Sequence, residues 1–153
     1  MQITQFLKKD CIAVNLSAAN KRELLEKLAA IGAKASGLHE REVFDILLQR
    51  ERLGTTGTGS GVAIPHGRFT NLSQVHGVFA RLNEPVDFQS VDEKPVDLVF
   101  MLLAPESHGA DHLKALAEVS KLFRNSKTCA ALRQSDRLET IYAVLTSPAS
   151  DAA

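Results

Sequence analysis

Apolar side chains recur along this chain at helical spacing in some stretches and as short continuous runs in others. The first helical pattern comprises four apolar positions, Leu24, Leu25, Leu28 and Ile31. Either Ser17 or Asn20 can cap this helix, which is predicted to run to about Ala35. Ser36-Gly37 follows directly and ends it.

A second helix is predicted from about Glu40 to Leu53, where Gly54 stops it, and it carries a charge within its apolar stripe. At about 100° per residue, Arg50 lies between Val43 and Ile46 on the helical wheel. Its stem can cover apolar surface while its head reaches water. Alternatively, the head emerges beside the glycine-rich segment that follows and holds an anion. The pattern leaves both interpretations open.

Short apolar runs predict strands, and they alternate with the helical patterns. The predicted strands are Val62–Ile64, Val75–Leu82 and Val96–Leu103, and Cys11–Leu16 is predicted to be either a first strand or an extended lead-in. The last is almost continuously apolar, which is typical of a central strand buried on both faces. Three further helices are predicted at about Asp111–Arg124, Lys127–Gln134 and Leu138–Leu145. The alternation predicts a single layered α/β domain over residues 1–147, with residues 148–153 as a disordered tail.

Composition narrows the class of protein. The 153 residues suit one domain, and 18 basic side chains balance 18 acidic ones, which argues against nucleic acid as the main partner. Cys11 and Cys129 form neither a CxxC pair nor a disulfide framework, so we expect no metal site and a reduced, cytoplasmic location. The longest apolar run, Leu98–Ala104, is too short to span a bilayer, so the protein is not expected to be membrane-embedded.

The segment Gly54–Arg68, GTTGTGSGVAIPHGR, carries the candidate chemistry. Glycine lets a backbone approach a partner closely, and Pro65 stiffens the backbone that presents His66. Gly67 and Arg68 then provide flexibility and a positive charge. A lone histidine in a turn is most often a solvated turn residue, but this context favours function.

A second histidine, His112, falls in the first turn of the helix after the central strand. It shares a helix face with Leu116, Val119 and Phe123, so it is predicted to point inward. It can be a core histidine with one hydrogen bond. Its position, however, is where α/β proteins bind ligands, and the helix dipole favours a neutral imidazole there.

Known nucleotide motifs do not fit the glycine-rich segment. A Walker A loop needs Lys where Val62 stands, and a Rossmann fingerprint needs a small residue at that position and a preceding strand. Imidazole can instead act as a covalent nucleophile toward phosphorus. Because no nucleotide site is visible, the phosphoryl group would come from another protein. The residues alone thus suggest a phosphocarrier.

The stretches Arg50–Gly57 and Gly61–Gly67 closely resemble enzyme IIA domains of the mannitol/fructose class, which belong to the bacterial phosphoenolpyruvate-dependent sugar phosphotransferase system. Similar segments occur at Pro85–Phe88, Pro95–Leu98 and His112-Leu113, whereas Thr58 departs from the commoner aliphatic residue. The resemblance implies a mixed, mostly parallel sheet flanked by helices.

The resemblance also implies roles for individual residues. His66 would be phosphorylated through Nε2, His112 would support it, and Arg50 would stabilise the phosphoryl charge. No metal or nucleotide cofactor is expected. The residues expected to bind the phosphoryl group are Thr55, Thr56, Gly57 and Gly67.

Within this family, a free-standing chain looks most like the nitrogen-regulatory type. Such a protein would accept phosphate from an HPr-like phosphocarrier and would regulate protein partners tied to nitrogen metabolism and potassium transport. One alternative is a sugar-specific IIA that passes phosphate to a fructose or mannitol IIB component. Another is a non-catalytic module that binds a small anion in the same cleft.

Overall fold

A mixed sheet forms the centre of the protein, as seen in the computed structural model, which describes residues 1–107 and 109–147. Its strands are β1 (Ile12–Leu16), β2 (Gly57–Gly59), β3 (Val62–Ala63), β4 (His66–Phe69), β5 (His76–Val86) and β6 (Val96–Pro105). The order is β1-β5-β6-β3-β2, and β4 also pairs with β6. The pairs β1–β5, β3–β6 and β4–β6 are parallel, whereas β5–β6 and β2–β3 are antiparallel. The expected mixed, mostly parallel sheet is confirmed.

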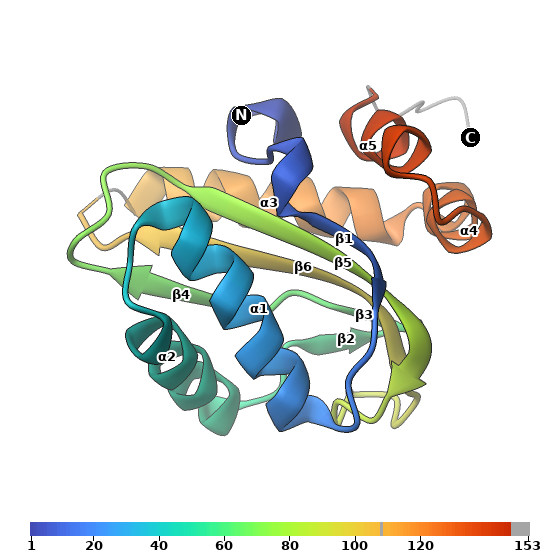
Figure 1. Ribbon diagram of the computed structural model, residues 1–153, viewed down its shortest axis with the longest axis horizontal. Helices are drawn as coiled ribbons and strands as arrows, with labels where there is room; N and C mark the ends of the chain where they lie inside the picture. Colours follow the sequence, from blue (N-terminus) through green and yellow to red (C-terminus); the bar gives the residue numbers. More distant parts are fainter. Residues whose placement is uncertain (108, 148–153) are drawn as a thin grey trace.

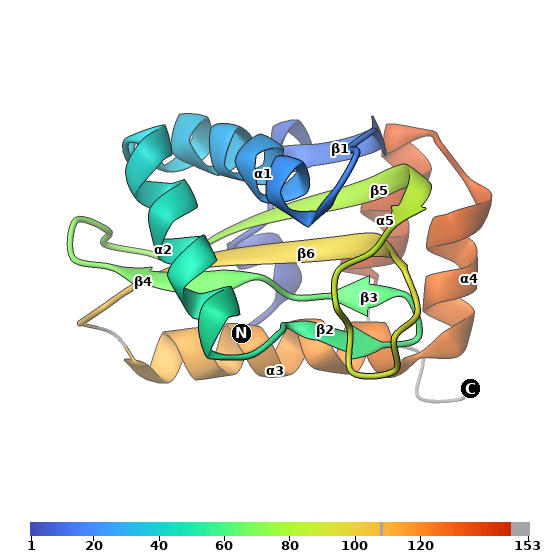
Figure 2. The ribbon, with the colours of Figure 1, turned by 90° about the horizontal axis from the view of Figure 1, so that it is seen from below.

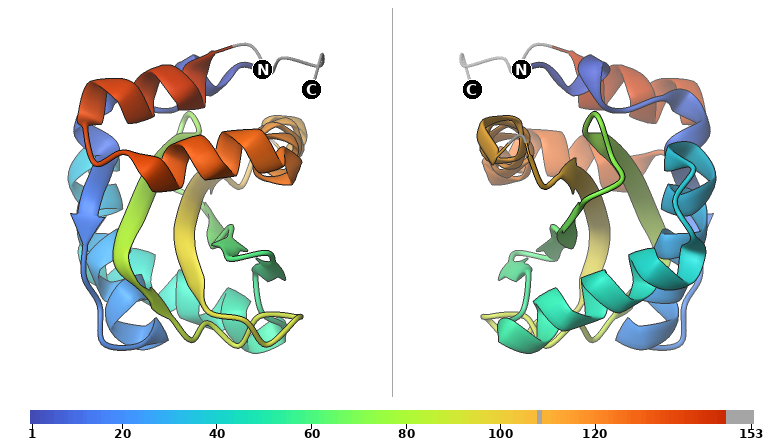
Figure 3. Two further views of the ribbon diagram at one scale, coloured as in Figure 1. Left: turned by 90° about the vertical axis from the view of Figure 1, so that its right-hand side faces the viewer. Right: turned by 90° about the vertical axis from the view of Figure 1, so that its left-hand side faces the viewer.

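Helices flank this sheet on both faces. They are α1 (Lys21–Ser36), α2 (Glu40–Leu53), α3 (Gly109–Arg124), α4 (Ser126–Gln134) and α5 (Leu138–Thr146). Figure 1 shows α1 and α2 in front of the sheet and α3 behind it, and Figure 2 shows the same layers edge-on. The short helices α4 and α5 lie side by side (Figure 3). Two short 3₁₀ helices, Ile3–Gln5 and Lys9–Cys11, precede β1 and were not predicted.

Local capping explains why the first two helices begin and end where the sequence predicts. Of the two candidate caps, Asn20 is used: its side chain accepts a hydrogen bond from the Glu23 backbone N–H at 2.9 Å. At the other end Gly37 adopts φ 80°, a left-handed conformation that glycine adopts without strain. Gly54 ends α2, and its N–H donates to the Glu51 carbonyl.

Strand β6 is the centre of the core. Every residue in it except Asp97 is buried, which confirms the prediction of a central strand covered on both faces. Phe100 lies opposite Phe79 of β5, and their rings meet edge to face at 6.3 Å between centroids. Packing around β6 therefore stabilises the middle of the sheet. The short strands β3 and β4 pair with β6 and carry the candidate functional site.

The glycine-rich segment is more regular than predicted. Strands β2 and β3 form a hairpin whose two-residue turn, Ser60-Gly61, has positive φ at both positions, 59° and 80°. The expected turn at His66 is wrong, because His66 begins β4 and pairs beside Leu102 of β6. This strand has only four residues, too few for the alternation of its polar residues, His66 and Arg68, with Gly67 and Phe69 to indicate a strand.

Strand β5 is also longer than predicted, extending through Pro85 to Val86. Its pairing with β6 shifts register between Arg81 and Val86, so Pro85 needs no ladder hydrogen bond. The predicted disordered tail, residues 148–153, and His108 lie outside the described residues. Within the described part of the chain, no helix is long and apolar enough to cross a membrane.

Candidate functional site

The backbone holds His66 in a defined orientation. The preceding residue, Pro65, accepts a hydrogen bond from the Leu102 N–H at 2.9 Å, which attaches the segment to β6. The His66 ring nitrogen Nδ1 lies 2.8 Å from the Ile64 carbonyl oxygen. Since a carbonyl oxygen only accepts, Nδ1 carries the proton and donates it. In the neutral ring, Nε2 therefore keeps its lone pair.

His112 reaches the same place from the opposite layer. It lies in the first turn of α3, is only 4% exposed, and its ring centroid is 5.4 Å from that of His66. The rings are tilted by 49°, so they meet at an angle instead of stacking. The predicted inward orientation of His112 is confirmed. Its buried Nδ1 has no hydrogen-bond partner among the described residues, unlike that of an ordinary core histidine.

Burial and nearby positive charge keep both imidazoles neutral near pH 7. Burial lowers the pKa of His66 below 6.5, and the charges of Arg50 and Arg68 lower it further. The hydrogen bond to Ile64 and the charge of Glu51 oppose this lowering. Burial, followed by the nearby His66 and Arg68, lowers the pKa of His112 to about 4. Two neutral imidazoles thus lie next to each other.

Arg50 is half-buried at the end of α2, and its Nη1 donates to the Gly54 carbonyl at 2.9 Å. That carbonyl follows the last turn of the helix, where a cation is favourable. The Arg50 charge also acts on His66, as its effect on that pKa indicates. The head of Arg50 therefore lies beside the glycine-rich segment, at Gly54, and its charge reaches the histidine. A role of Arg50 in holding an anion stays a prediction.

A buried ionic network that the sequence analysis missed supports this segment. Glu51 is 7% exposed and accepts hydrogen bonds from both the backbone N–H, at 3.0 Å, and the hydroxyl of Thr56. Lys21, at the start of α1, pairs with the same carboxylate at 3.0 Å. The network joins two helices to the strand segment that leads to His66. The adjacent Arg50-Glu51 pair was visible in the sequence, but not the fact that its acidic member is buried.

The other predicted phosphoryl-binding residues have structural partners. The Thr55 hydroxyl donates to the Phe88 carbonyl at 3.1 Å and accepts from the Gly57 N–H at 3.1 Å. A Cβ at Gly57 would lie 2.3 Å from Ser90 Oγ, and one at Gly67 would lie 2.6 Å from Ile46 Cγ2. Both glycines thus permit close packing. A role for these residues and Thr56 in binding the phosphoryl group stays a prediction.

Arg68, which the sequence indicated only as a positive charge after His66, acts on both histidines of the candidate site. It is exposed and lies two residues after His66 in β4, so both side chains project from the same face of the strand. Its charge lowers the pKa of both histidines. The sequence signal for this placement was that Arg68 follows His66 by two residues, as side chains on one face of a strand do. It was not used because a turn, not a strand, was expected at His66. Among the described residues, no group of His, Cys, Asp and Glu side chains could hold a metal ion.

Fold and site together define a layered α/β protein with a neutral histidine pair flanked by arginines. The model of one protein family, described as "Phosphoenolpyruvate-dependent sugar phosphotransferase system, EIIA 2", matches residues 5–147. The chain therefore belongs to this family and is a component of the phosphotransferase-system type. The resemblance inferred from the sequence is confirmed.

Similar proteins carry both regulatory and sugar-specific names. A nitrogen regulatory protein of Bradyrhizobium diazoefficiens is 50% identical over 153 residues, covering 100% of both chains. The crystal structure of nitrogen regulatory protein IIA-Ntr from Neisseria meningitidis superposes with a TM-score of 0.90 at 37% identity, covering 94% of this chain and 99% of that one. A fructose-specific EIIA component of Haloferax volcanii is 33% identical over 137 residues, 89% of each chain.

Proposed function

We propose that this protein accepts a phosphoryl group on Nε2 of His66 from an HPr-like phosphocarrier. The observation that carries the proposal is the 2.8 Å hydrogen bond from Nδ1 to the Ile64 carbonyl. This bond places the ring proton on Nδ1 and leaves Nε2 as the nucleophilic nitrogen. The lowered pKa of His66 supports it, because the ring is then neutral at pH 7.

The transfer needs no external acid or base. The Nε2 lone pair forms the new N–P bond while the bond from phosphorus to the donor's imidazole nitrogen breaks. The donor ring, protonated at its other nitrogen, leaves as a neutral imidazole, and His66 keeps its Nδ1 proton as a phosphoimidazolium. Negative charge on the transferring group would be stabilised by Arg50 and Arg68, which already act on His66. Neutral His112 would donate an N–H to a phosphoryl oxygen, which suits a buried ring whose Nδ1 has no partner among the described residues.

The phosphorylation state would then regulate protein partners, including those tied to nitrogen metabolism and potassium transport. The names of the relatives from Bradyrhizobium and Neisseria support a regulatory role. A phosphoryl group adds about two negative charges at neutral pH, which is enough to change which surfaces can dock against the site. The change would occur at His66, on which Arg50 and Arg68 already act, so the added negative charge would offset their positive charge.

A sugar-specific role is the alternative, in which His66 passes its phosphoryl group to a IIB component. The fructose-specific relative from Haloferax favours it. Addition of a purified fructose or mannitol IIB component to the phosphorylated protein separates the two roles. The regulatory role predicts that the label stays on His66, whereas rapid transfer to IIB would establish sugar delivery.

The primary test is phosphorylation in vitro by phosphoenolpyruvate, enzyme I and an HPr-type carrier, followed by intact-mass measurement. We expect one phosphoryl group that survives base and is lost in acid. His66→Asn should abolish it, although the Asn amide can still donate to Ile64. The same change at exposed His39, which caps α2, is the matched control and should leave labelling intact. No label with matched donors would overturn the proposal and favour a module that binds an anion without a covalent step.

A further inference from the structure

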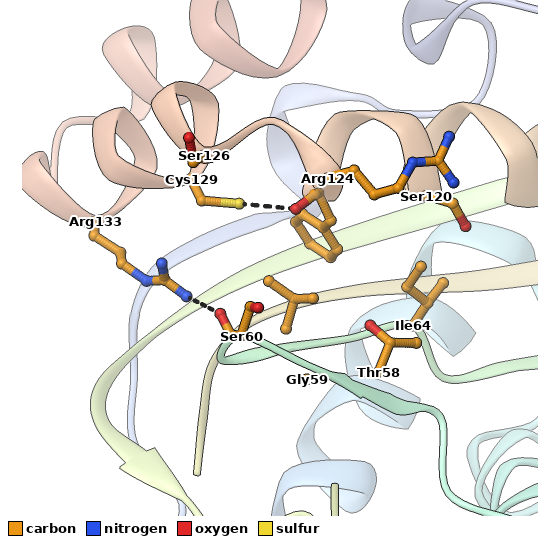
Figure 4. A pocket seen from close by; sticks show the side chains of 11 residues that line it. Thr58, Gly59, Ser60, Ile64, Ser120, Arg124, Ser126, Cys129 and Arg133 are labelled. Atoms are coloured by element: carbon orange, nitrogen blue, oxygen red, sulfur yellow. Dashed lines mark hydrogen bonds between the residues drawn. The ribbon is translucent and has the colours of Figure 1, made fainter. Parts of the chain in front are cut away.

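A cavity of about 490 Å³ lies on the α3 side of the β2–β3 hairpin, away from the histidine pair along that helix. It is bounded by the hairpin, the C-terminal half of α3 and the first two turns of α4 (Figure 4). Its volume falls within the range of about 300–1,000 Å³ that is usual for small-molecule sites. The proposed phosphoryl transfer uses none of its polar side chains.

The polar lining consists of hydroxyls and guanidinium groups. The hydroxyl residues are Thr58, Ser60, Ser120 and Ser126. Arg124 is exposed and makes no ion pair or hydrogen bond through its side chain to any described residue. It shares a face of α3 with Ser120, one turn earlier, and Figure 4 shows the two side chains together. None of the described residues that line the cavity is acidic, so the charge of Arg124 is not neutralised by them.

A second guanidinium is held rigidly at the other side of the cavity. The Nε of Arg133 donates to both carboxylate oxygens of Asp97, at 3.0 and 2.9 Å, and its Nη2 donates to the Ser60 carbonyl at 2.8 Å. These bonds connect α4 to the turn of the hairpin. Val62, Ile64 and Phe123 supply an apolar part of the wall. A ligand that fits would have an anionic group, hydrogen-bonding oxygens and a short carbon body.

We propose that this cavity binds a small organic anion, a carboxylate or phosphate ester of a few carbons, with Arg124 as its main charged contact. Ile64 connects the cavity to the histidine: its side chain lines the wall, and its carbonyl holds Nδ1 of His66. The Ile64 N–H is in turn tied to the Thr56 carbonyl at 3.1 Å. Occupation of the cavity therefore changes the rate at which His66 is phosphorylated. This second statement rests on the proposed function, whereas the binding site does not.

Binding is tested without any phosphotransferase component. The probes are succinate, glycerol 3-phosphate and inorganic phosphate, titrated into the isotope-labelled protein and followed by amide chemical shifts. We expect saturable shifts at the lining residues with succinate or glycerol 3-phosphate. The arm that saturates at lower concentration shows whether the carboxylate or the phosphate ester is preferred. Saturation by inorganic phosphate alone, or shifts confined to residues outside the cavity, would overturn the proposal.

A matched pair of variants tests the role of Arg124. Arg124→Gln should raise the dissociation constant of the preferred probe about tenfold or more, because a charged hydrogen bond is lost. Arg137→Gln makes the same change at another exposed arginine outside the cavity and should leave binding unchanged. Equal effects of the two variants would contradict a specific contact.

Coupling is tested separately by measuring the rate of phosphorylation by the HPr-type carrier. At a probe concentration that just saturates the wild type, the preferred probe should change the wild-type rate at least about twofold and should change the rate of Arg124→Gln by less, in proportion to its weaker binding. An unchanged rate, with binding intact, would overturn the coupling through Ile64. Absence of phosphorylation even without a probe would overturn the proposed function, and the titration would still decide the binding site.

Discussion

At the level of single residues, the candidate site combines a neutral imidazole with nearby positive charge. Burial lowers the pKa of His66 most, and the charges of Arg50 and Arg68 lower it further. The same two cations are suited to stabilise a transferring phosphoryl group. His66 could be singled out from its sequence context, because Pro65 and the flanking glycines are local signals. The neutral state of its ring depends on burial by other elements, which no local pattern specifies.

The low pKa of His112 makes stability depend on pH. Its pKa is about 4 in the folded protein and 6.5 when unfolded, so folding disfavours the proton. The stabilisation is complete above pH 6.5 and is lost as pH falls toward 4, by about 3 kcal/mol at most. We expect His112→Gln to flatten the fall in unfolding free energy between pH 7 and pH 4.5, measured by urea denaturation. Parallel losses in both proteins would contradict this prediction.

Arg50 offers a second prediction at this scale. Arg50→Ala should slow phosphorylation of His66 by about a hundredfold, because a positioned charge near the transferring group is lost. The fold should persist, since the side chain is half-buried and its one hydrogen bond goes to the Gly54 carbonyl. Rates are measured by rapid quench with phosphorylated carrier, and circular dichroism monitors folding. Exposed Arg52, on the same helix, provides the control as Arg52→Ala, and equal rates for both variants would exclude Arg50 from the mechanism.

At the level of helices and strands, an element can be predicted from the sequence when the contacts that determine it join residues close together in the chain. Helix α1 was predicted with its ends nearly correct, because Asn20 and Gly37 act within one turn of the backbone. Strand β4 was missed because what makes it a strand is parallel pairing with β6, whose residues lie more than thirty positions away. Arg68 was not singled out as a candidate site residue for the same reason. Residues two apart share a face only in a strand, so the shared face of Arg68 and His66 could be inferred only after β4 was known to be a strand.

The buried pair Lys21–Glu51 is predicted to be the main polar contact between α1, α2 and the segment entering β2. Its carboxylate is buried and also accepts two hydrogen bonds from Thr56. Glu51→Gln should therefore lower the unfolding free energy by about 3 kcal/mol, since it leaves a poorly solvated ammonium unpaired. Urea denaturation at pH 7 measures the effect.

The exposed pair Lys9–Glu139 is the matched control. Its side chains are 51% and 71% exposed, so Glu139→Gln should leave stability essentially unchanged. A similar loss in both variants would show that the burial of Glu51 gives no additional stability. A loss confined to Glu51→Gln, with His66 phosphorylation also slowed, would connect the network to the position of the site.

At the level of the whole molecule, one core links the elements that the sequence could only place in order. Buried apolar residues from the N-terminal 3₁₀ helices through α5 form one cluster with β6 within it. The layered α/β class followed from alternating patterns, but the strand order β1-β5-β6-β3-β2 did not. That order depends on which distant strands pair, and therefore on packing of the entire chain.

The two cysteines allow a test of whether this core unfolds as one unit. Cys11 and Cys129 are free thiols, each 5% exposed, in the segment before β1 and in α4. Burial raises the pKa of Cys11 to about 11 and raises that of Cys129 above its usual value. Both thiols should therefore react slowly in the native protein and rapidly once the structure opens.

Because both cysteines belong to the same core cluster, we expect them to be protected by the same free energy. Single-thiol variants, Cys11→Ala and Cys129→Ala, are labelled with a disulfide reagent at increasing urea. The opening free energy of each remaining thiol is compared with global unfolding of the same variant. Equal values would establish two-state behaviour across the domain. Labelling of Cys129 at a distinctly lower free energy would show instead that α4 and α5 open while the sheet stays folded. The cavity wall that α4 contributes would then be the part of the molecule most easily rearranged by a bound anion.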